Sequence, residues 1–330
     1  MTQNIRILNL HNNKYSVSLK KYSGYLIFLV IIIFFSIKSS TFLNSDNIIN
    51  ILRQSSILGI VSCGMTCILI GGGNHVIKGG IDISLANNLA LNSAIAAKLL
   101  SIGIPIYWVF AIVLFCGVII GLINSFTIVK LGVIPLLGTL AMMYLLQGTE
   151  LVITNNKVIG VDNHQLAFLA NTNFLFIPLT VWIFFVVSII LYVIFNKSVF
   201  SNWVNAVGGN DEAARIAGIN VNIVVTVTYI IAAITAVIAS LLITARLNGS
   251  VPGVGDTMLF DILLSSYLSA VFSPISKPNI PGTVVSSLFV GMLTNGFTLM
   301  NVSTYWVYAI KGVLILSAVS FTTRQQRRVG

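Results

Sequence analysis

Few residues of this chain have side chains that could do chemistry, and the ionisable ones of most interest lie in or beside long apolar stretches. They are Asp82, Glu150, Asp261 and Lys311. A charge that deep in apolar sequence is a functional hypothesis by default, because removing it from water is costly. Glu150 and Lys311 fall close enough to the ends of their stretches to reach polar surroundings, so Asp261 is the strongest candidate. Its nearest basic residue in sequence is Arg246, which keeps a salt-bridged structural role open.

No catalytic constellation accompanies these residues. The sequence has no HExxH, no GxSxG, no Cys/His cluster and no carboxylate pair at helical spacing. It also lacks a Walker A loop, because the five glycines from Gly71 to Gly80 are not followed by the GK[ST] ending whose lysine reaches phosphate. We therefore expect no enzymatic activity, no metal site and no cofactor bound by this chain. If ATP and Mg²⁺ drive it, a partner subunit binds them.

The composition is that of an integral membrane protein. Of the 330 residues, 56% are hydrophobic and 8% are charged, and the mean hydropathy is +0.97. Soluble proteins carry about 25% charged residues. Lipid cannot satisfy backbone polar groups, and the long apolar runs lack the alternation of barrel strands. The sequence thus predicts an all-α polytopic membrane protein.

The apolar runs predict about ten transmembrane helices, since one crossing needs about 20 residues. The runs lie near 22–38, 56–73, 83–100, 105–129, 134–153, 176–196, 221–244, 257–273, 282–300 and 304–321. They form one membrane domain, residues 22–321, between an N-terminal tail (1–21) and a C-terminal tail (322–330). Both tails are expected in the cytoplasm.

The distribution of Lys and Arg sets this orientation. With ten spans, the cytoplasmic loops and tails hold more of the basic residues than the opposite side, as the positive-inside rule requires. The basic residues on the opposite side are Lys38, Arg53, Lys98, Lys157 and Arg246. The net charge of +10 is dispersed over short loops, so it indicates contact with anionic membrane lipid and not with nucleic acid.

A glycine-rich stretch from Gly71 to Ser84 separates the second and third runs. Each glycine inside a helix costs about 1 kcal/mol relative to alanine, so we expect a helix broken near Gly79–Asp82. Asp82 and Ser84 stand where N-cap residues precede a helix. Two interpretations stay open: a capped loop, or a discontinuous helix whose freed N–H groups line a polar passage.

Neutral hydrogen-bonding side chains suggest a translocation pathway. An uncharged, hydroxylated solute needs donors and acceptors with few charges along its route. Interhelical hydrogen bonding explains the same residue types equally well. The candidate pathway residues are Gly80, Asp82, Ser84, Thr139, Asn295 and Asn301.

A polar island lies between the sixth and seventh runs, where residues 204–220 read VNAVGGNDEAARIAGIN. A segment this polar must sit in water, which places it in the predicted cytoplasmic loop 197–220. Residues 212–215 form one helical turn that could dock on a soluble partner. Small alanines permit close approach, and Glu212 and Arg215 can pair with a partner's charges.

Six blocks of the sequence resemble the ribose-type permeases of bacterial ABC sugar importers, in the order and spacing of that family. They are FLNSDNIINILRQSS (42–56), GIDIS (80–84), TLAMMYLLQG (139–148), GGNDEAARIAGINV (208–221), TNGFTLMNVS (294–303) and KGVLILSAV (311–319). The resemblance implies an inner-membrane permease subunit for a monosaccharide or similar small hydroxylated solute. It also implies a cytoplasmic coupling helix between spans 6 and 7, seated in a cleft of the ATPase.

By this resemblance, the residues of the ATPase interface are Gly208, Gly209, Asn210, Glu212, Ala213, Ala214, Arg215 and Gly218. The implied partners are a cytoplasmic ABC ATPase that binds ATP and Mg²⁺, a periplasmic or other extracytoplasmic solute-binding protein, and a second permease subunit. The sequence departs from the family at Leu259, where a glutamate is usual, and at 269–273, where a Gly-Gly-Thr-type turn is usual. These departures leave open which solute is carried and whether the permease pair is a homodimer or a heterodimer.

Two other classes of protein remain as alternatives. An ion-coupled secondary transporter could use Asp82 and Asp261, although buried acids are few. A membrane-embedded receptor or scaffold would not need the broken, glycine-rich span.

Overall fold

The computed structural model describes residues 24–72, 80–273 and 276–329, with the side chains of 321–329 left aside. The described residues are almost entirely helical, and their strands are two residues long. This confirms the all-α prediction. The predicted N-terminal tail (1–21) and Gly79 lie outside the described residues.

Every predicted apolar run coincides with a helix. These helices are Gly24–Lys38, α2 (Ser45–Gly72), α3 (Leu85–Ser101), α4 (Ile106–Val129), α5 (Pro135–Thr154), α7 (Leu179–Asn196), α10 (Val221–Leu247), α11 (Val254–Leu268), α12 (Ile280–Leu299) and α13 (Thr304–Val329). Among the described helices, six are long and apolar enough to cross a membrane: α2, α4, α5, α7, α10 and α12. The chain is therefore a multi-pass membrane protein. The number of about ten transmembrane helices stays a prediction.

The largest departures from the predicted boundaries are in two helices. Helix α2 starts at Ser45, well before the predicted start near residue 56, because its first turns carry the polar residues that hid them from a hydropathy pattern. Helix α13 continues to Val329 and so includes residues 322–329 of the predicted C-terminal tail, 322–330.

Short strands tie together the loops at one end of the bundle. Strand β1 (Ile159–Gly160) pairs antiparallel with β4 (Gly249–Ser250), and β2 (Asn173–Phe174) pairs with β3 (Ile177–Pro178). Gly249 has φ +148°, and a Cβ there would collide with the Ile159 carbonyl oxygen. The pairing thus joins the loop after α5 to the loop after α10. Helix α6 (His164–Asn171) lies in the same region of the chain.

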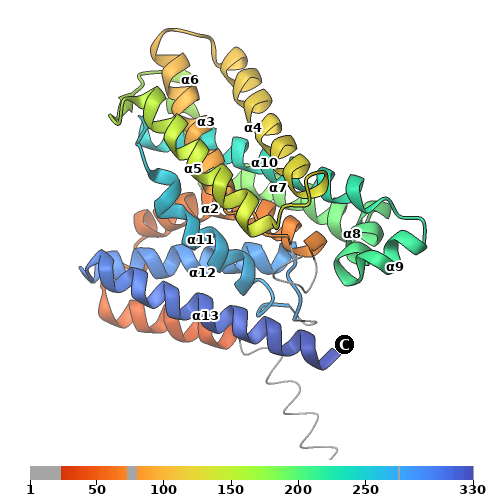
Figure 1. Ribbon diagram of the computed structural model, residues 1–330. Helices are drawn as coiled ribbons and strands as arrows, with labels where there is room; N and C mark the ends of the chain where they lie inside the picture. Colours follow the sequence, from red (N-terminus) through yellow and green to blue (C-terminus); the bar gives the residue numbers. More distant parts are fainter. Residues whose placement is uncertain (1–23, 73–79, 274–275, 330) are drawn as a thin grey trace, which may run out of the picture.

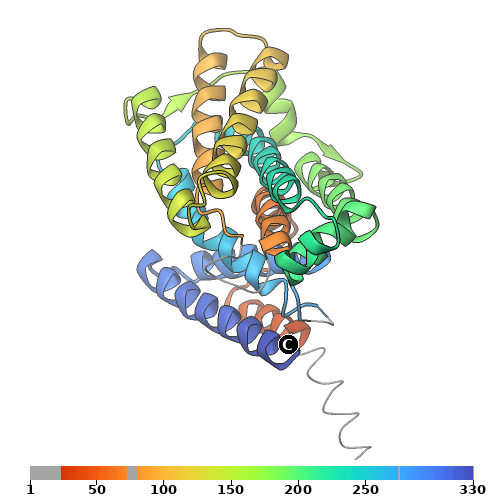
Figure 2. The same cartoon turned by 45° about the vertical axis from the view of Figure 1, so that its right-hand side comes forward.

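Helix α2 is the centre of the bundle. It runs through the middle of the molecule, with α12, α13 and the 24–38 helix on one side and α3, α4 and α5 on the other (Figures 1 and 2). Nearly every residue from Ser55 to Ile68 is buried. Two of its buried polar groups bond to other helices: the Thr66 and Thr283 hydroxyls are hydrogen-bonded at 2.7 Å, and Ser266 Oγ donates to the Ser62 carbonyl at 3.0 Å.

Small residues let α10 approach its neighbours closely. A Cβ on Gly121 of α4 would lie 2.9 Å from the Ala233 Cβ, and one on Gly117 would collide with Val237. On α2, a Cβ at Gly64 would lie 3.1 Å from the Ala232 Cα. Such contacts replace the hydrophobic driving force that helices lack in lipid. These glycines and alanines therefore serve close helix packing.

Candidate functional site

The polar island folds into two short helices at one end of the bundle (Figures 1 and 2). Helix α8 covers Val199–Gly209 and α9 covers Asp211–Ile216. Ser198 caps α8 by accepting from the Ser201 N–H at 3.2 Å, and Asn210 caps α9 by accepting from the Ala213 N–H at 3.0 Å. A side-chain oxygen at the N-cap satisfies an orphan N–H, so Asn210 separates the two helices where the sequence suggested one turn.

A left-handed glycine ends α9. Gly218 has φ +82°, its N–H donates to the Arg215 carbonyl, and the Ile219 N–H donates to the Ala214 carbonyl, both at 3.0 Å. Glycine takes this conformation at little cost, whereas a residue with a Cβ is strained in it. The chain then turns into α10, whose first turn is capped by Asn220.

Helix α9 presents one buried and one exposed face. Ala214 is 3% exposed and packs into the core, while Glu212, Ala213 and Arg215 are exposed. Ile216 is 89% exposed. The sequence did not predict this exposure, because the position of Ile216 in the EAARIAG block does not show which way its side chain faces. We call Glu212, Ala213, Arg215 and Ile216 the coupling surface. Within the described part of the chain, the Glu212 and Arg215 side chains form no ion pair, so both are available to a partner.

A cavity of about 380 Å³ lies behind this segment. Its walls come from the last turn of α2, the ends of α4 and α5, the first turns of α10, and Gly80. The loop 197–220, called the coupling loop below, supplies Gly208, Gly209, Asn210, Asp211, Glu212 and Arg215. Gly80, predicted for the pathway, therefore lines the same cavity as residues predicted for ATPase coupling.

Asp82 is the centre of a buried polar cluster directly after Gly80. It is 5% exposed, and its Oδ1 accepts from the Ser84 N–H at 2.9 Å and from Ser84 Oγ at 2.6 Å. Asn124 Nδ2 of α4 donates to Asp82 Oδ2 at 3.1 Å and to Ser84 Oγ at 2.8 Å. The prediction that Ser84 caps α3 with its side chain is wrong, because its hydroxyl donates to Asp82 instead.

The backbone of the linker, residues 80–84, is held by three helices. Thr139 Oγ1 of α5 accepts from the Ile83 N–H at 3.2 Å, and Tyr229 Oη of α10 donates to the Ile81 carbonyl at 3.3 Å. A Cβ on Gly80 would lie 2.6 Å from the Ile68 carbonyl of α2. Four pathway candidates thus lie together: Gly80, Asp82, Ser84 and Thr139.

The other two pathway candidates lie elsewhere. Asn295 of α12 exchanges two hydrogen bonds with Asn47 of α2, at 3.0 and 2.9 Å. Asn301 is exposed, has φ +53° and forms the turn between α12 and α13. Within the described residues no contact joins either one to the linker.

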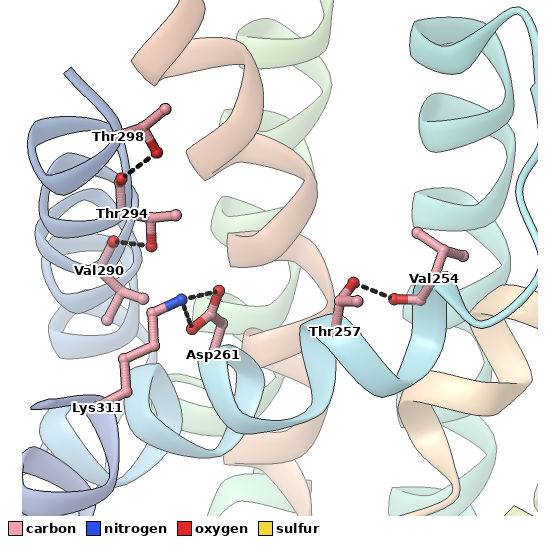
Figure 3. A network of polar contacts seen from close by, with 7 residues as sticks. All are labelled: Val254, Thr257, Asp261, Val290, Thr294, Thr298 and Lys311. Carbon is pink, nitrogen blue, oxygen red and sulfur yellow. Dashed lines mark hydrogen bonds and ion pairs between the residues drawn. The ribbon is translucent and has the colours of Figure 1, made fainter. Parts of the chain in front are cut away.

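The remaining buried charges are paired or bonded. Asp261 of α11 meets Lys311 of α13 at 2.7 Å (Figure 3). Glu150 is fully buried, and its Oε1 accepts from the Gly253 N–H at 3.2 Å. The prediction that Glu150 and Lys311 reach polar surroundings at the ends of their runs is therefore wrong. Among the described residues, no group of three His, Cys, Asp or Glu could hold a metal ion.

A multi-pass helical bundle with a cavity at one end and an exposed helical turn over it is the architecture of a membrane transport subunit. Comparisons support this class. The family described as the permease component of a branched-chain amino acid transport system matches residues 47–319, and the chain belongs to that family. It is accordingly a transport subunit of the inner (plasma) membrane and not an enzyme.

Individual relatives are sugar permeases by name. The chain is 33% identical to the ribose import permease of Bacillus subtilis over 303 residues, which is 91% of this chain and 92% of the relative. It is 30% identical to the ribose import permease of Haemophilus influenzae over 300 residues, 90% and 91% of the two chains. It is 26% identical to the L-arabinose permease of Escherichia coli over 307 residues, 93% and 92% of the two. No solved structure matches the chain.

Proposed function

We propose that this chain is the membrane subunit of an ATP-driven ABC importer for a monosaccharide or a similar small hydroxylated solute. The relatives described above are named for ribose and arabinose, although the family description names branched-chain amino acids. The polar side chains of the linker favour the sugar. They are neutral or already engaged by neutral donors, and an amino acid's charged termini would need free charged partners.

The coupling surface is the proposed docking site for a cytoplasmic ATPase that binds ATP and Mg²⁺. Ile216 is exposed, and Glu212 and Arg215 form no ion pair with the described residues, so an apolar anchor is combined with charges that fix orientation. Gly208, Gly209, Asn210 and Gly218 shape the turn that presents it. Ala213 permits close approach, and Ala214 fastens the turn to the bundle.

The cavity shared by the coupling loop and Gly80 is the observation that carries the mechanism. Closure of the ATPase would push α9, and because Ala214 packs into the core, the push would reach α8 and the first turns of α10. Tyr229 of α10 is bonded to the linker at Ile81, so the movement would reach Asp82 as well. Two packings of this region, with the cavity open or collapsed, would alternate access to the inside.

The proposal also includes the predicted membrane topology and the remaining predicted partners. Ten crossings with both ends in the cytoplasm put the linker at the inner mouth of the pathway and Asn295 and Asn301 at the outer side. A solute-binding protein would deliver the sugar there, and a second permease subunit would complete the pathway.

The test combines coupling variants with a direct transport assay. Ile216→Asp and Arg215→Glu should each abolish co-purification of the ATPase and ATP-dependent uptake in proteoliposomes, with insertion unchanged. Lys157→Glu, a charge reversal predicted on the opposite side, is the matched control and should retain both. Undiminished ATPase binding and uptake in both coupling variants would contradict the proposal.

The identity of the substrate and the source of energy are tested by separate uptake experiments. Labelled ribose, arabinose, galactose and leucine should rank a sugar first. Uptake that persists without the ATPase and collapses with an uncoupler would point to the ion-coupled alternative.

A further inference from the structure

Two arginines face one small cavity at the end of the bundle away from α8 and α9. Arg53 lies on α2, and Arg246 lies in the last turn of α10, whose 27 residues separate it from the coupling loop by about 40 Å. The cavity measures about 210 Å³, and its other walls are Asn50, Ile57, Ala170, Asn171 and Thr180. Its volume is below the roughly 300 Å³ of ordinary small-molecule pockets, so the cavity suits a small ligand.

Neither arginine has an acidic partner within the described residues. The ion pair formed there is Asp261–Lys311, and Arg53 Nη2 donates instead to the neutral Asn173 Oδ1 at 3.2 Å. Arg53 Nε is buried and has no hydrogen-bond acceptor in the described part of the chain. Asp261 lines a neighbouring cavity together with Arg246, but its carboxylate is held by Lys311.

A buried hydroxyl completes the polar lining. Thr180, in the first turn of α7, is 3% exposed, and its Oγ1 has no hydrogen-bond partner among the described residues. A hydroxyl left unpaired away from water costs free energy, as does a guanidinium N–H. The wall thus holds unused donors from α2 and α7 and the charge of Arg246.

Charge and geometry select the ligand. The two arginines line the same cavity, where their like charges repel each other, and an anion between them would be attracted to both. Guanidinium groups match the paired oxygens of carboxylate and phosphate, to which they donate in a bidentate fork. Arg246 is exposed on one side, which gives such an ion a way in.

We propose that Arg53, Arg246 and Thr180 form a binding site for one small oxyanion, of the size of a phosphate group. The oxyanion is either free in solution or the phosphate of a lipid headgroup, since both present the same oxygens. The site rests on the placement of these side chains and does not depend on which solute the protein carries.

The experiment measures thermal unfolding of the purified full chain in neutral detergent, with inorganic phosphate titrated at constant ionic strength against chloride. The wild type should be stabilised saturably, and Arg53→Gln or Arg246→Gln should weaken the apparent affinity roughly tenfold or more. Lys98→Gln, which removes a lysine predicted on the same side of the membrane, is the matched control and should titrate as the wild type does. Thr180→Val removes only the hydroxyl, so it tests the site even if an arginine variant fails to fold.

A second experiment distinguishes a free oxyanion from the phosphate of a lipid headgroup. In nanodiscs of phosphatidylcholine with or without phosphatidylglycerol, a lipid-derived oxyanion gives Arg53-dependent stabilisation by phosphatidylglycerol and no further response to free phosphate. A free ion gives the phosphate response in both lipid mixtures. If neither phosphate nor phosphatidylglycerol stabilises the wild type more than the Arg53, Arg246 and Thr180 variants, the site does not exist.

Discussion

Lys311 Nζ lies 2.7 Å from Asp261 Oδ1 and 3.0 Å from Asp261 Oδ2, in a pair that joins α13 to α11 (Figure 3). The two side chains are 7% and 14% exposed, so each charge depends on the other. Removing one partner from such a pair typically costs about 3–5 kcal/mol, because the remaining charge stays buried. We therefore expect Asp261→Leu or Lys311→Met, each made alone, to lower the thermal stability of the purified protein strongly.

The double variant is the informative control. Asp261→Leu combined with Lys311→Met removes both charges and should recover most of the stability, since an apolar pair of similar volume often replaces a buried ion pair at little cost. If the double variant is stable but cannot transport, the pair acts in the mechanism. If the losses of the single variants simply add, the two residues are not coupled.

The sequence located Asp261 in an apolar run but could not identify its partner. Lys311 is 50 positions away in sequence, and the pairing follows from how α11 and α13 pack, which hydropathy does not encode. The helices themselves were predictable because length and apolarity are local properties. The start of α2 was not predictable, because the segment from Ser45 to Gln54 is polar enough to resemble a loop.

In the candidate site, too, some features were predictable from the sequence and others required the fold. Composition marked the coupling loop and the glycine-rich linker separately, and Gly218 and Asn210 have roles that their residue types favour. Nothing in the sequence showed that Gly80 and Glu212 line one cavity, because the cavity is made by the ends of helices distant in sequence. The exposure of Ile216 also required the fold, since it depends on Ala214 facing inward.

Gly121 tests the close packing of α4 on α10. A Cβ there would lie 2.9 Å from the Ala233 Cβ and 3.1 Å from the Tyr229 carbonyl oxygen, so Gly121→Ala must push the helices apart. We expect a loss of about 1–3 kcal/mol in thermal or denaturant unfolding, as for other overpacked cores. Gly148→Ala on α5 is the matched control: its Cβ would meet nothing within 4 Å, so helix propensity should make it neutral or stabilising. Equal effects of both changes would show that α4 and α10 do not pack as described.

The Asp82 cluster predicts a loss of transport that exceeds the loss of protein. Asp82→Ala leaves the Ser84 N–H and Asn124 Nδ2 without the acceptor they share, at about 1–3 kcal/mol for each unsatisfied group. The linker should then lose its fixed shape while the helices still insert. Uptake normalised to the amount of inserted protein should fall severalfold or more.

A buried amide elsewhere provides the comparison for Asp82. Among the described residues, the Asn92 side chain bonds only to Asn88 of its own helix, donating to Asn88 O at 2.9 Å and to Asn88 Oδ1 at 2.6 Å. Asn92→Leu should therefore change uptake and expression in proportion. A proportional change for Asp82→Ala as well would leave Asp82 a purely structural residue.

Gly218 tests whether the shape of α9 matters for docking. Its φ of +82° strains any residue with a Cβ, although a Cβ there would meet no atom within 4 Å, so Gly218→Ala probes backbone conformation alone. The strain is worth about 1–2 kcal/mol, and if it shifts the turn away from its docked shape, the affinity for the ATPase should fall about tenfold. Gly148→Ala on α5 is the matched control, because Gly148 lies outside the coupling segment, its Cβ also meets nothing and its φ is not positive. Titration of the purified ATPase against both variants in detergent measures the difference. Equal affinities would mean that the end of α9 adapts on binding and that its turn is not prearranged for the partner.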